Sequence, residues 1–270
     1  MAPHAHPVDA ALGSPELLES PLLRAAGFRH GFFTRRGGVS APPFDALSFT
    51  AAGTPPAALE ENLRRAAVAL GVSAQQLYFL TQVHGVACRV LGGEEARGAV
   101  LTEEGDVTLS ARPGVACAVR TADCVPVLLA DPTTGAVAAI HSGWRGTVAN
   151  VVLAGVEALV ALSGSPATHF VAAVGPHIES CCFEVDDAVA DALAAASSAG
   201  RTVIVSGDKP HVDLRAVVSA QLSDAGLPLS SVDHVPGCTV CDAARFFSFR
   251  RDGDASGRLL AAIVAGERTP

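Results

Sequence analysis

The sequence predicts a single α/β domain, and three observations support this. Short apolar segments with strand-like spacing alternate with alanine-rich segments of helical spacing along the chain. Neither an internal repeat nor a flexible linker interrupts this alternation. The 270 residues are 49% hydrophobic, which is enough for a large core. We expect residues 22–270 to form the domain and residues 1–21 to form a mobile leader, with a short helix at Pro15–Leu23.

The composition argues against a nucleic acid or a membrane as the partner. The net charge is −8, and lysine and arginine form no cluster that could neutralise a row of phosphates. No stretch is long and apolar enough to predict a membrane span, and the N-terminus lacks the features of a signal peptide. Seven cysteines at irregular spacing indicate reduced thiols and not a disulfide framework. We therefore expect a cytoplasmic protein with a small-molecule partner.

The first part of the chain predicts two strands around a helix. Residues 27–34 alternate polar and apolar side chains like a strand and end at the Gly37–Gly38 turn. Pro55–Leu70 has apolar residues at helical spacing and acidic residues in its early turns, which is typical of an amphipathic helix. Leu77–Val83 is an apolar run that predicts a strand, with His84 at the bend that follows, and the run V-A-C-A-V at 115–119 predicts a further strand that leads into T-A-D-C.

The centre of the chain predicts a β-hairpin that carries chemistry at one end. Two apolar strands, Val125–Ala130 and Ala136–Ile140, are joined by the turn D-P-T-T-G. Cys124 immediately precedes the first strand, and His141 immediately follows the second. An antiparallel hairpin would therefore bring this thiol and this imidazole to the same end of the sheet.

The remaining elements alternate helices and strands. A helix is expected at Thr147–Leu162, a strand at Phe170–Val174, an alanine-rich helix at Val185–Ala196, a strand at 201–205 and a helix at His211–Leu222, which begins at an acidic cap. The segments after residue 231 are expected to make two closing strands around a polar hairpin.

Three side chains are candidates for a catalytic metal site. His84, Cys124 and His141 offer two imidazoles and a thiolate, a ligand set that suits zinc and also copper and leaves a fourth position open. Their spacing is not that of a local metal motif, so two other interpretations stay open. Cys124 could be a nucleophile activated by His141, or all three could be inert core residues.

The other cysteines give weaker signals. Cys238 and Cys241 have the C-x-x-C spacing of redox and metal sites, but without a second such pair we favour an ordinary structural role. The adjacent Cys181 and Cys182 would point to opposite faces of an extended segment, so we expect that they cannot both line one pocket.

Six motifs in order give the chain a resemblance to a known family. They are T-R-R-G-G-V-S-A-P-P-F, T-Q-V-H-G, T-A-D-C-V-P-V-L, A-I-H-S-G-W-R-G, G-P-H-I followed by C-F-E-V, and C-T followed by F-F-S-F-R-R-D-G. With these motifs the chain resembles the YfiH/YlmD family, also called laccase-domain proteins, peptidoglycan editing factors or laccase-type purine nucleoside phosphorylases. Phe249 stands where the family usually has tyrosine, and no ligand position of the family is missing.

The resemblance implies a fold, a metal and an activity. The implied fold is one α/β domain of layered, mixed sheets flanked by helices, and the implied metal ligands are His84, Cys124 and His141. The implied metal is zinc, with copper as an alternative. The implied reactions are phosphorolysis of adenosine, inosine and methylthioadenosine, and deamination of adenosine, so that purine nucleosides and phosphate are the expected partners of a monomer or homodimer.

Roles for further residues follow as hypotheses from these reactions. In deamination, a carboxylate such as Asp123 could relay the proton. In phosphorolysis, phosphate could be held by Arg35 at the Gly37–Gly38 turn, by Arg145 at the N-terminus of the helix after the hairpin, or by Arg250.

Three alternatives to this activity stay open. The first is a Cys-His hydrolase that edits amino acids in peptidoglycan precursors, with a Cys124 thiolate free of metal. The second is a copper polyphenol oxidase, which we rank low because the sequence offers one three-ligand site and no second copper cluster. The third is a binding module with structural zinc, which would need a fourth protein ligand such as Cys88 or Cys117.

Overall fold

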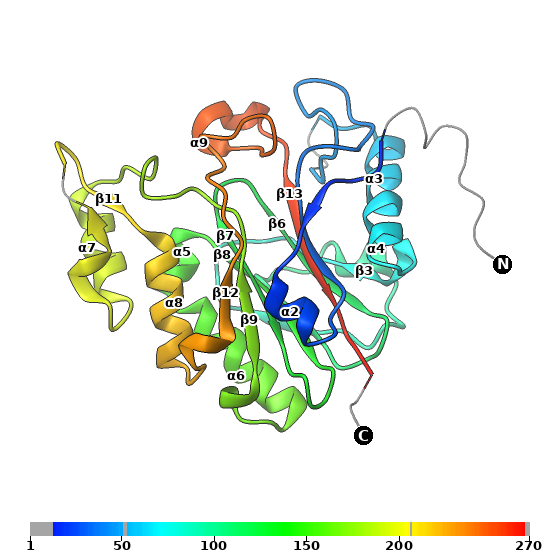
Figure 1. Ribbon diagram of the computed structural model, residues 1–270. Coiled ribbons are helices and arrows are strands. Elements are labelled where there is room, and N and C mark those ends of the chain that lie inside the picture. Colours follow the sequence, from blue (N-terminus) through cyan, green and yellow to red (C-terminus); the bar gives the residue numbers. More distant parts are fainter. Residues whose placement is uncertain (1–12, 51–52, 206, 268–270) are drawn as a thin grey trace.

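The computed structural model describes residues 13–50, 53–205 and 207–267, and two stacked sheets lie between two layers of helices (Figure 1). One sheet has the strand order β1-β2-β13-β6-β3, and the other has the order β12-β9-β7-β8-β5-β4. The first sheet consists of β1 (Leu17–Leu18), β2 (His30–Phe33), β3 (Leu77–Tyr78), β6 (Ala116–Thr121) and β13 (Leu259–Val264). The second consists of β4 (Cys88–Val90), β5 (Val107–Ser110), β7 (Val125–Ala130), β8 (Val137–Ser142), β9 (Val171–Val174) and β12 (Val232–His234).

The helices lie on the outer faces of the two sheets and in the connections at their ends. A separate antiparallel pair, β10 (Ile204–Val205) and β11 (His211–Val212), lies beside them. The helices are α2 (Pro21–Ala25), α3 (Pro56–Ala69), α4 (Arg97–Val100), α5 (Trp144–Val148), α6 (Val151–Ser163), α7 (Asp187–Ala195), α8 (Leu214–Asp224) and α9 (Phe249–Asp252). None of the described helices is long and apolar enough to cross a membrane.

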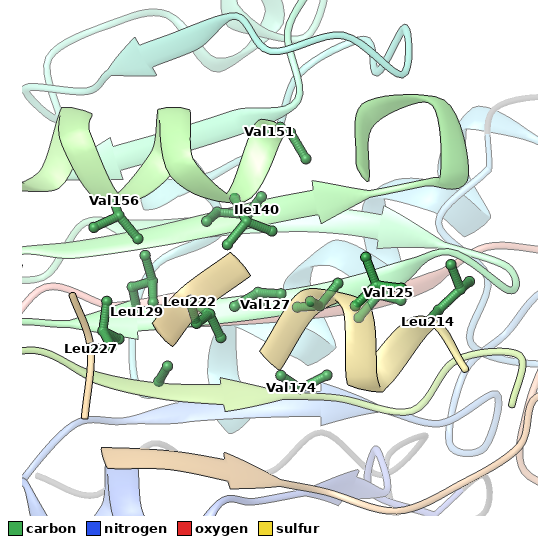
Figure 2. Close-up of a cluster of buried hydrophobic side chains, with 14 of the residues drawn as sticks. Val125, Val127, Leu129, Ile140, Val151, Val156, Val174, Leu214, Leu222 and Leu227 are labelled. Carbon is green, nitrogen blue, oxygen red and sulfur yellow. The ribbon is translucent and has the colours of Figure 1, made fainter. Parts of the chain in front are cut away.

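Alternation along the strands explains the layers. In β7, Val125, Val127 and Leu129 pack in the core under α6 and α8, whereas Leu128 and Ala130 face the other sheet. Figure 2 shows the first of these cores, with side chains of β7 and β8 pointing toward the two helices. Both faces of the strand are buried, which is why its sequence reads as a continuous apolar run.

The outer face of the five-stranded sheet is covered by α3. Leu63, Ala66 and Ala67 of this helix share a core with Leu260 and Ala262 of β13.

Several predicted elements are confirmed with shifted ends. They are the helices now seen as α3, α7 and α8 and the strands now seen as β2, β6, β7, β8 and β9. The Asp213 cap is also confirmed, because its side chain accepts a hydrogen bond from the backbone N–H of Ala216 at 2.9 Å.

Other predicted elements were wrong in part. The strand expected at Leu77–Val83 is paired only at Leu77–Tyr78, and residues 201–205 form mostly a 3-10 turn. The helix expected at Thr147–Leu162 is two helices, because Asn150 between them adopts a left-handed backbone with φ 66°. The closing strands β12 and β13 lie in different sheets, and Phe249–Asp252 between them is a helical turn.

The boundary of the leader also needs correction. Of the predicted leader, Leu17–Leu18 pairs with β2 as the edge strand of the first sheet, and α2 begins at Pro21 with Ser20 as its cap. The short helix expected at Pro15–Leu23 thus starts later, because the two half-buried leucines pair with the sheet as a strand. Residues 1–12 lie outside the described residues.

Candidate metal centre and its cavity

The pairing of β7 with β8 determines where Cys124 and His141 lie. Val125 pairs with Ser142 and Pro126 pairs with His141, so the thiol and the imidazole come from the same end of the sheet. This confirms the hairpin prediction. The His141 side chain is only 3% exposed, whereas Cys124 is half-buried and lines a cavity.

His84 reaches the same place from the chain that follows β3. Its backbone is left-handed, with φ 60°, and is held by Asp106, whose carboxylate accepts hydrogen bonds from the N–H groups of residues 83–85 at 2.7 to 3.3 Å. The imidazole of His84 lies edge-on to that of His141, with ring centroids 4.9 Å apart. Its Nε2 atom is 3.7 Å from the Cys124 sulfur.

Asp106 also fixes the orientation of His141. Its Oδ1 accepts a hydrogen bond from His141 Nδ1 at 2.7 Å, which leaves Nε2 of this ring as the ligand atom. The ligand atoms of His84, Cys124 and His141 all lie within 4.8 Å of one another. Our sequence reasoning assigned no role to Asp106. It lies just before β5, which pairs with β8 in a register that sets Val107 opposite Ile140, and no local sequence pattern specifies this register.

The charges of the three groups depend on one another. Burial tends to raise the pKa of the Cys124 thiol, but the charge of His141 and hydrogen bonds from both histidines lower it to about 6. Burial tends to lower the pKa of His141, but the Cys124 thiolate and Asp106 raise it to about 9. Likewise, the hydrogen bond from His141 lowers the pKa of Asp106 despite its burial. Without a metal, the pair is a thiolate and an imidazolium between about pH 6 and pH 9.

This donor set fits a catalytic transition metal. A thiolate and two imidazoles suit zinc and copper, and three protein ligands leave a coordination position open. In the part of the chain that the structure describes, no further cysteine or carboxylate joins this group. Cys88 donates its thiol hydrogen to backbone carbonyls, and Cys117 is buried between the sheets, so neither is the fourth ligand of a closed structural site.

A cavity of about 610 Å³ lies in front of the three ligands. Its walls combine positive charge with aromatic surface. The arginines in its lining are Arg120, Arg145, Arg250 and Arg258, and the aromatic residues are Trp144, Phe183 and Phe249. The arrangement can bind an anion next to a flat, apolar group.

Arg120 is a strong candidate for an anion-binding residue, and our sequence reasoning missed it together with Arg258. Two nitrogens of Arg120 donate to the backbone carbonyls of Phe49 and Leu80, while its buried Nε has no hydrogen-bond partner among the described residues. Burial and the charge of Arg258 lower the pKa of Arg120 to about 10. An anion between the two guanidinium groups would relieve this repulsion.

The three arginines singled out in the sequence have different places. Arg145 and Arg250 line the cavity, as the phosphate hypothesis requires. Arg35 does not line the cavity. Its guanidinium donates hydrogen bonds to the backbone and side chain of Asp45 and to the carbonyl of Ala243, and it stacks on Phe247. The expectation that Arg35 binds phosphate is therefore corrected.

Asp123 lines the cavity beside Cys124 and accepts hydrogen bonds from two other segments of the chain. Its backbone is left-handed, with φ 86°. Oδ1 accepts from the Thr239 hydroxyl at 2.6 Å, and Oδ2 accepts from the Arg250 backbone N–H at 2.6 Å. Each carboxylate oxygen keeps a second lone pair that is able to accept a proton. The role of Asp123 in proton transfer stays a prediction.

The cysteines outside the triad need a larger correction. Cys181 and Cys182 were expected to diverge, but they lie in a turn closed by hydrogen bonds to the Glu179 carbonyl, and their sulfurs are 3.7 Å apart. Cys238 and Cys241 lie against them, so that the four thiols form a second group of potential metal ligands. The structure thus offers two such groups, although the second contains no imidazole of the kind expected in a copper cluster.

Known proteins resemble this chain in both sequence and structure. The family model described as "multi-copper polyphenol oxidoreductase laccase" matches residues 29–266. Over 245 residues the chain is 39% identical to a purine nucleoside phosphorylase of Deinococcus radiodurans, covering 90% of this chain and 92% of that protein. It is 36% identical over 207 residues to adenosine deaminase RL5 of an unknown prokaryotic organism, covering 73% of this chain and 78% of that protein. The crystal structure of Bacillus licheniformis YfiH matches with a TM-score of 0.86 and 28% identity, covering 94% of this chain and 97% of that one.

Fold and site together define a two-sheet α/β protein with a candidate His-Cys-His metal centre in an arginine-lined cavity. The chain belongs to the laccase-domain family, and its resemblance to YfiH is confirmed.

Proposed function

We propose that this protein is a zinc-dependent purine nucleoside phosphorylase that acts on adenosine, inosine and methylthioadenosine and also deaminates adenosine. The observation that carries the proposal is the convergence of three metal ligands, four arginines and three aromatic side chains on one cavity. A purine packs well against aromatic and apolar surface, and phosphate pairs with guanidinium groups. The names of the two relatives, a phosphorylase and a deaminase, support the same reactions.

The metal would be held by Nε2 of His84, Sγ of Cys124 and Nε2 of His141. When bound, zinc supplies Lewis acidity at the cavity floor. Asp106 keeps one His141 proton on Nδ1, so metal binding at neutral pH would displace only the proton on Nε2 and needs no tautomer change. The lowered pKa of Cys124 keeps its sulfur a thiolate at neutral pH.

In phosphorolysis, the arginines would bind phosphate and hold one of its oxygens toward the ribose. A bond then forms between this oxygen and C1′ while the bond from C1′ to the purine nitrogen breaks. The electron pair of that bond stays on the base, which takes up a proton as it leaves. Arg120 and Arg258 would stabilise the phosphate charge, and the aromatic wall would orient the base.

In deamination, water adds to the purine carbon that bears the amino group, and ammonia leaves. Asp123 lies in the cavity lining next to Cys124, and we propose that it moves a proton between the water and the departing amine.

The test is release of hypoxanthine from inosine with and without phosphate. We expect release to require phosphate, and Cys124→Ala to abolish it together with adenosine deamination. Arg120→Lys should raise the KM for phosphate roughly 10- to 100-fold, because a buried charge-assisted hydrogen bond contributes about 1.5–3 kcal/mol. Arg35→Lys is the matched control and should leave this KM unchanged. Release at the same rate without phosphate would contradict the proposal.

A second candidate function rests on the thiolate itself. The lowered pKa of Cys124, its contact with His141 and the hydrogen bond from His141 to Asp106 also resemble a Cys-His-Asp catalytic triad. Such a hydrolase would act on amino acids of peptidoglycan precursors and would work without metal. Chelation separates the two: a phosphorylase loses activity when metal is removed, whereas the hydrolase gains a free nucleophile.

A further inference from the structure

Four cysteines from two distant segments converge beside the cavity wall. The parallel pairing of β9 with β12 sets His234 opposite Val174, and it is continued by a bridge between His177 and Cys238. The chain turns after each partner, at residues 180–182 and at residues 239–241. The two turns therefore lie next to each other, and each contributes two thiols, Cys181 with Cys182 and Cys238 with Cys241.

The spacing of the sulfurs matches a coordination polyhedron and not a disulfide. The Cys181 sulfur is 3.7, 3.6 and 3.6 Å from those of Cys182, Cys238 and Cys241, and the sulfurs of Cys182 and Cys241 are 3.4 Å apart. All four lie within 4.8 Å of one another. A zinc ion with Zn–S bonds of about 2.3 Å places tetrahedral ligands about 3.8 Å apart, whereas a disulfide needs about 2.05 Å.

The surroundings compensate the charge that such a group would carry. The backbone N–H groups of Glu179, Val240 and Cys241 lie close enough to the Cys238 sulfur to favour a thiolate there. The guanidinium of Arg250 lies nearby and donates to the carbonyl oxygen of Cys182 at 3.3 Å. Neighbouring N–H groups and an adjacent cation stabilise the negative charge of a tetrathiolate metal site.

We propose that Cys181, Cys182, Cys238 and Cys241 form a closed zinc site that is separate from the His84, Cys124 and His141 centre. Four thiolates select zinc among common cellular divalent ions, and four protein ligands leave no position for substrate, so the role is structural. Because both turns coordinate the same ion, the ion holds the turn after β9 against the turn after β12. Both turns support the cavity, because Thr239 donates to Asp123 at 2.6 Å and Arg250 donates to the Glu184 carbonyl at 2.9 Å.

Metal content of the full-length protein tests the proposal. We expect the wild-type protein, purified anaerobically with zinc, to hold about two zinc ions per chain, one for each ligand group. A His84→Ala/Cys124→Ser variant, which lacks two ligands of the first centre, should keep one ion. After replacement by cobalt, this ion should show the intense absorption of a tetrathiolate complex.

Cys241→Ser should lose one ion and this absorption, and Cys88→Ser is the matched control, since Cys88 is exposed and outside both groups. If Cys241→Ser does not fold, the His84→Ala/Cys124→Ser protein still decides the question. A metal-free protein in that background would overturn the proposal. So would thiol counting that finds the four cysteines paired in disulfides, or a cobalt spectrum without thiolate character.

Discussion

Replacing Asp106 by asparagine should weaken metal binding at the His84, Cys124 and His141 centre. Oδ1 of Asp106 accepts from His141 Nδ1 and from the His84 N–H, and Oδ2 accepts from the Gly85 N–H. In asparagine, one of these atoms becomes an NH2 group. On the Oδ1 side it would push the His141 proton to Nε2, the nitrogen that the metal needs. On the Oδ2 side it would repel the Gly85 N–H and release the backbone that holds His84.

The expected loss follows from the contacts. Removing the outer carboxylate of a ligating histidine weakens metal affinity about 10- to 100-fold, which corresponds to about 1.4–2.8 kcal/mol. Asp106 is only 1% exposed, so the change also removes at least one buried charge-assisted hydrogen bond, and we expect the metal-free protein to lose about 1.5–3 kcal/mol of unfolding free energy.

The assay is competition with a chromophoric chelator, with Cys124→Ser as the blank because it lacks a ligand of this centre. Urea unfolding of the metal-free proteins measures the effect on stability. Asp131→Asn is the matched control, since Asp131 is buried at the far end of the β7–β8 hairpin and accepts from the Thr133 N–H and the Thr134 hydroxyl. The control should lose stability and keep its zinc affinity. Unchanged affinity in Asp106→Asn, or an equal loss in both variants, would refute the reasoning.

Two further predictions concern the same centre. Gly143→Ala should lower zinc affinity at least about tenfold, because a Cβ here would overlap His84 Cδ2 and lie 3.0 Å from the Cys124 sulfur. Gly98→Ala is the control and should have no effect on zinc affinity, because a Cβ at Gly98 meets open space. The second prediction concerns the alkylation rate of Cys124 in the metal-free protein, measured by peptide mass spectrometry at different pH values. The rate should stay constant as the pH falls toward neutrality and drop to half near pH 6, since the pKa of the thiol is lowered from 9.0 to about 6. A midpoint near pH 9 would contradict the thiolate-imidazolium pair.

How much of the site the sequence could predict depends on how local each contact is. Cys124 and His141 belong to one hairpin, so a turn motif and two apolar runs were enough to bring them together. His84 was a candidate from its residue type, but only the family motif assigned it to the site, because the arrangement of the two sheets is what brings the bend after β3 to this hairpin. Asp106 depends on the register of β5 against β8, which no local pattern specifies.

The positions of Cys181, Cys182 and Arg120 could not be predicted from the sequence for the same reason. The extended geometry assumed for Cys181 and Cys182 fails because hydrogen bonds to Glu179 close the segment into a turn. Arg120 lies within β6, where the sequence suggested only an apolar strand, and its place in the cavity comes from tertiary packing. In contrast, Arg35 looked suitable beside two glycines, but neighbouring backbone carbonyls already occupy its guanidinium.

The two groups of ligands are linked by a short path, which explains why a structural ion would matter for the reaction. Thr239 follows Cys238 directly and donates to Asp123, and Asp123 precedes Cys124. Asp123 has a left-handed backbone that neighbouring contacts must hold, and its carboxylate also positions the Arg250 N–H in the cavity wall. An ion that fixes the turn around Cys238 therefore fixes Asp123, and through it both the Cys124 thiolate and an arginine proposed to bind phosphate.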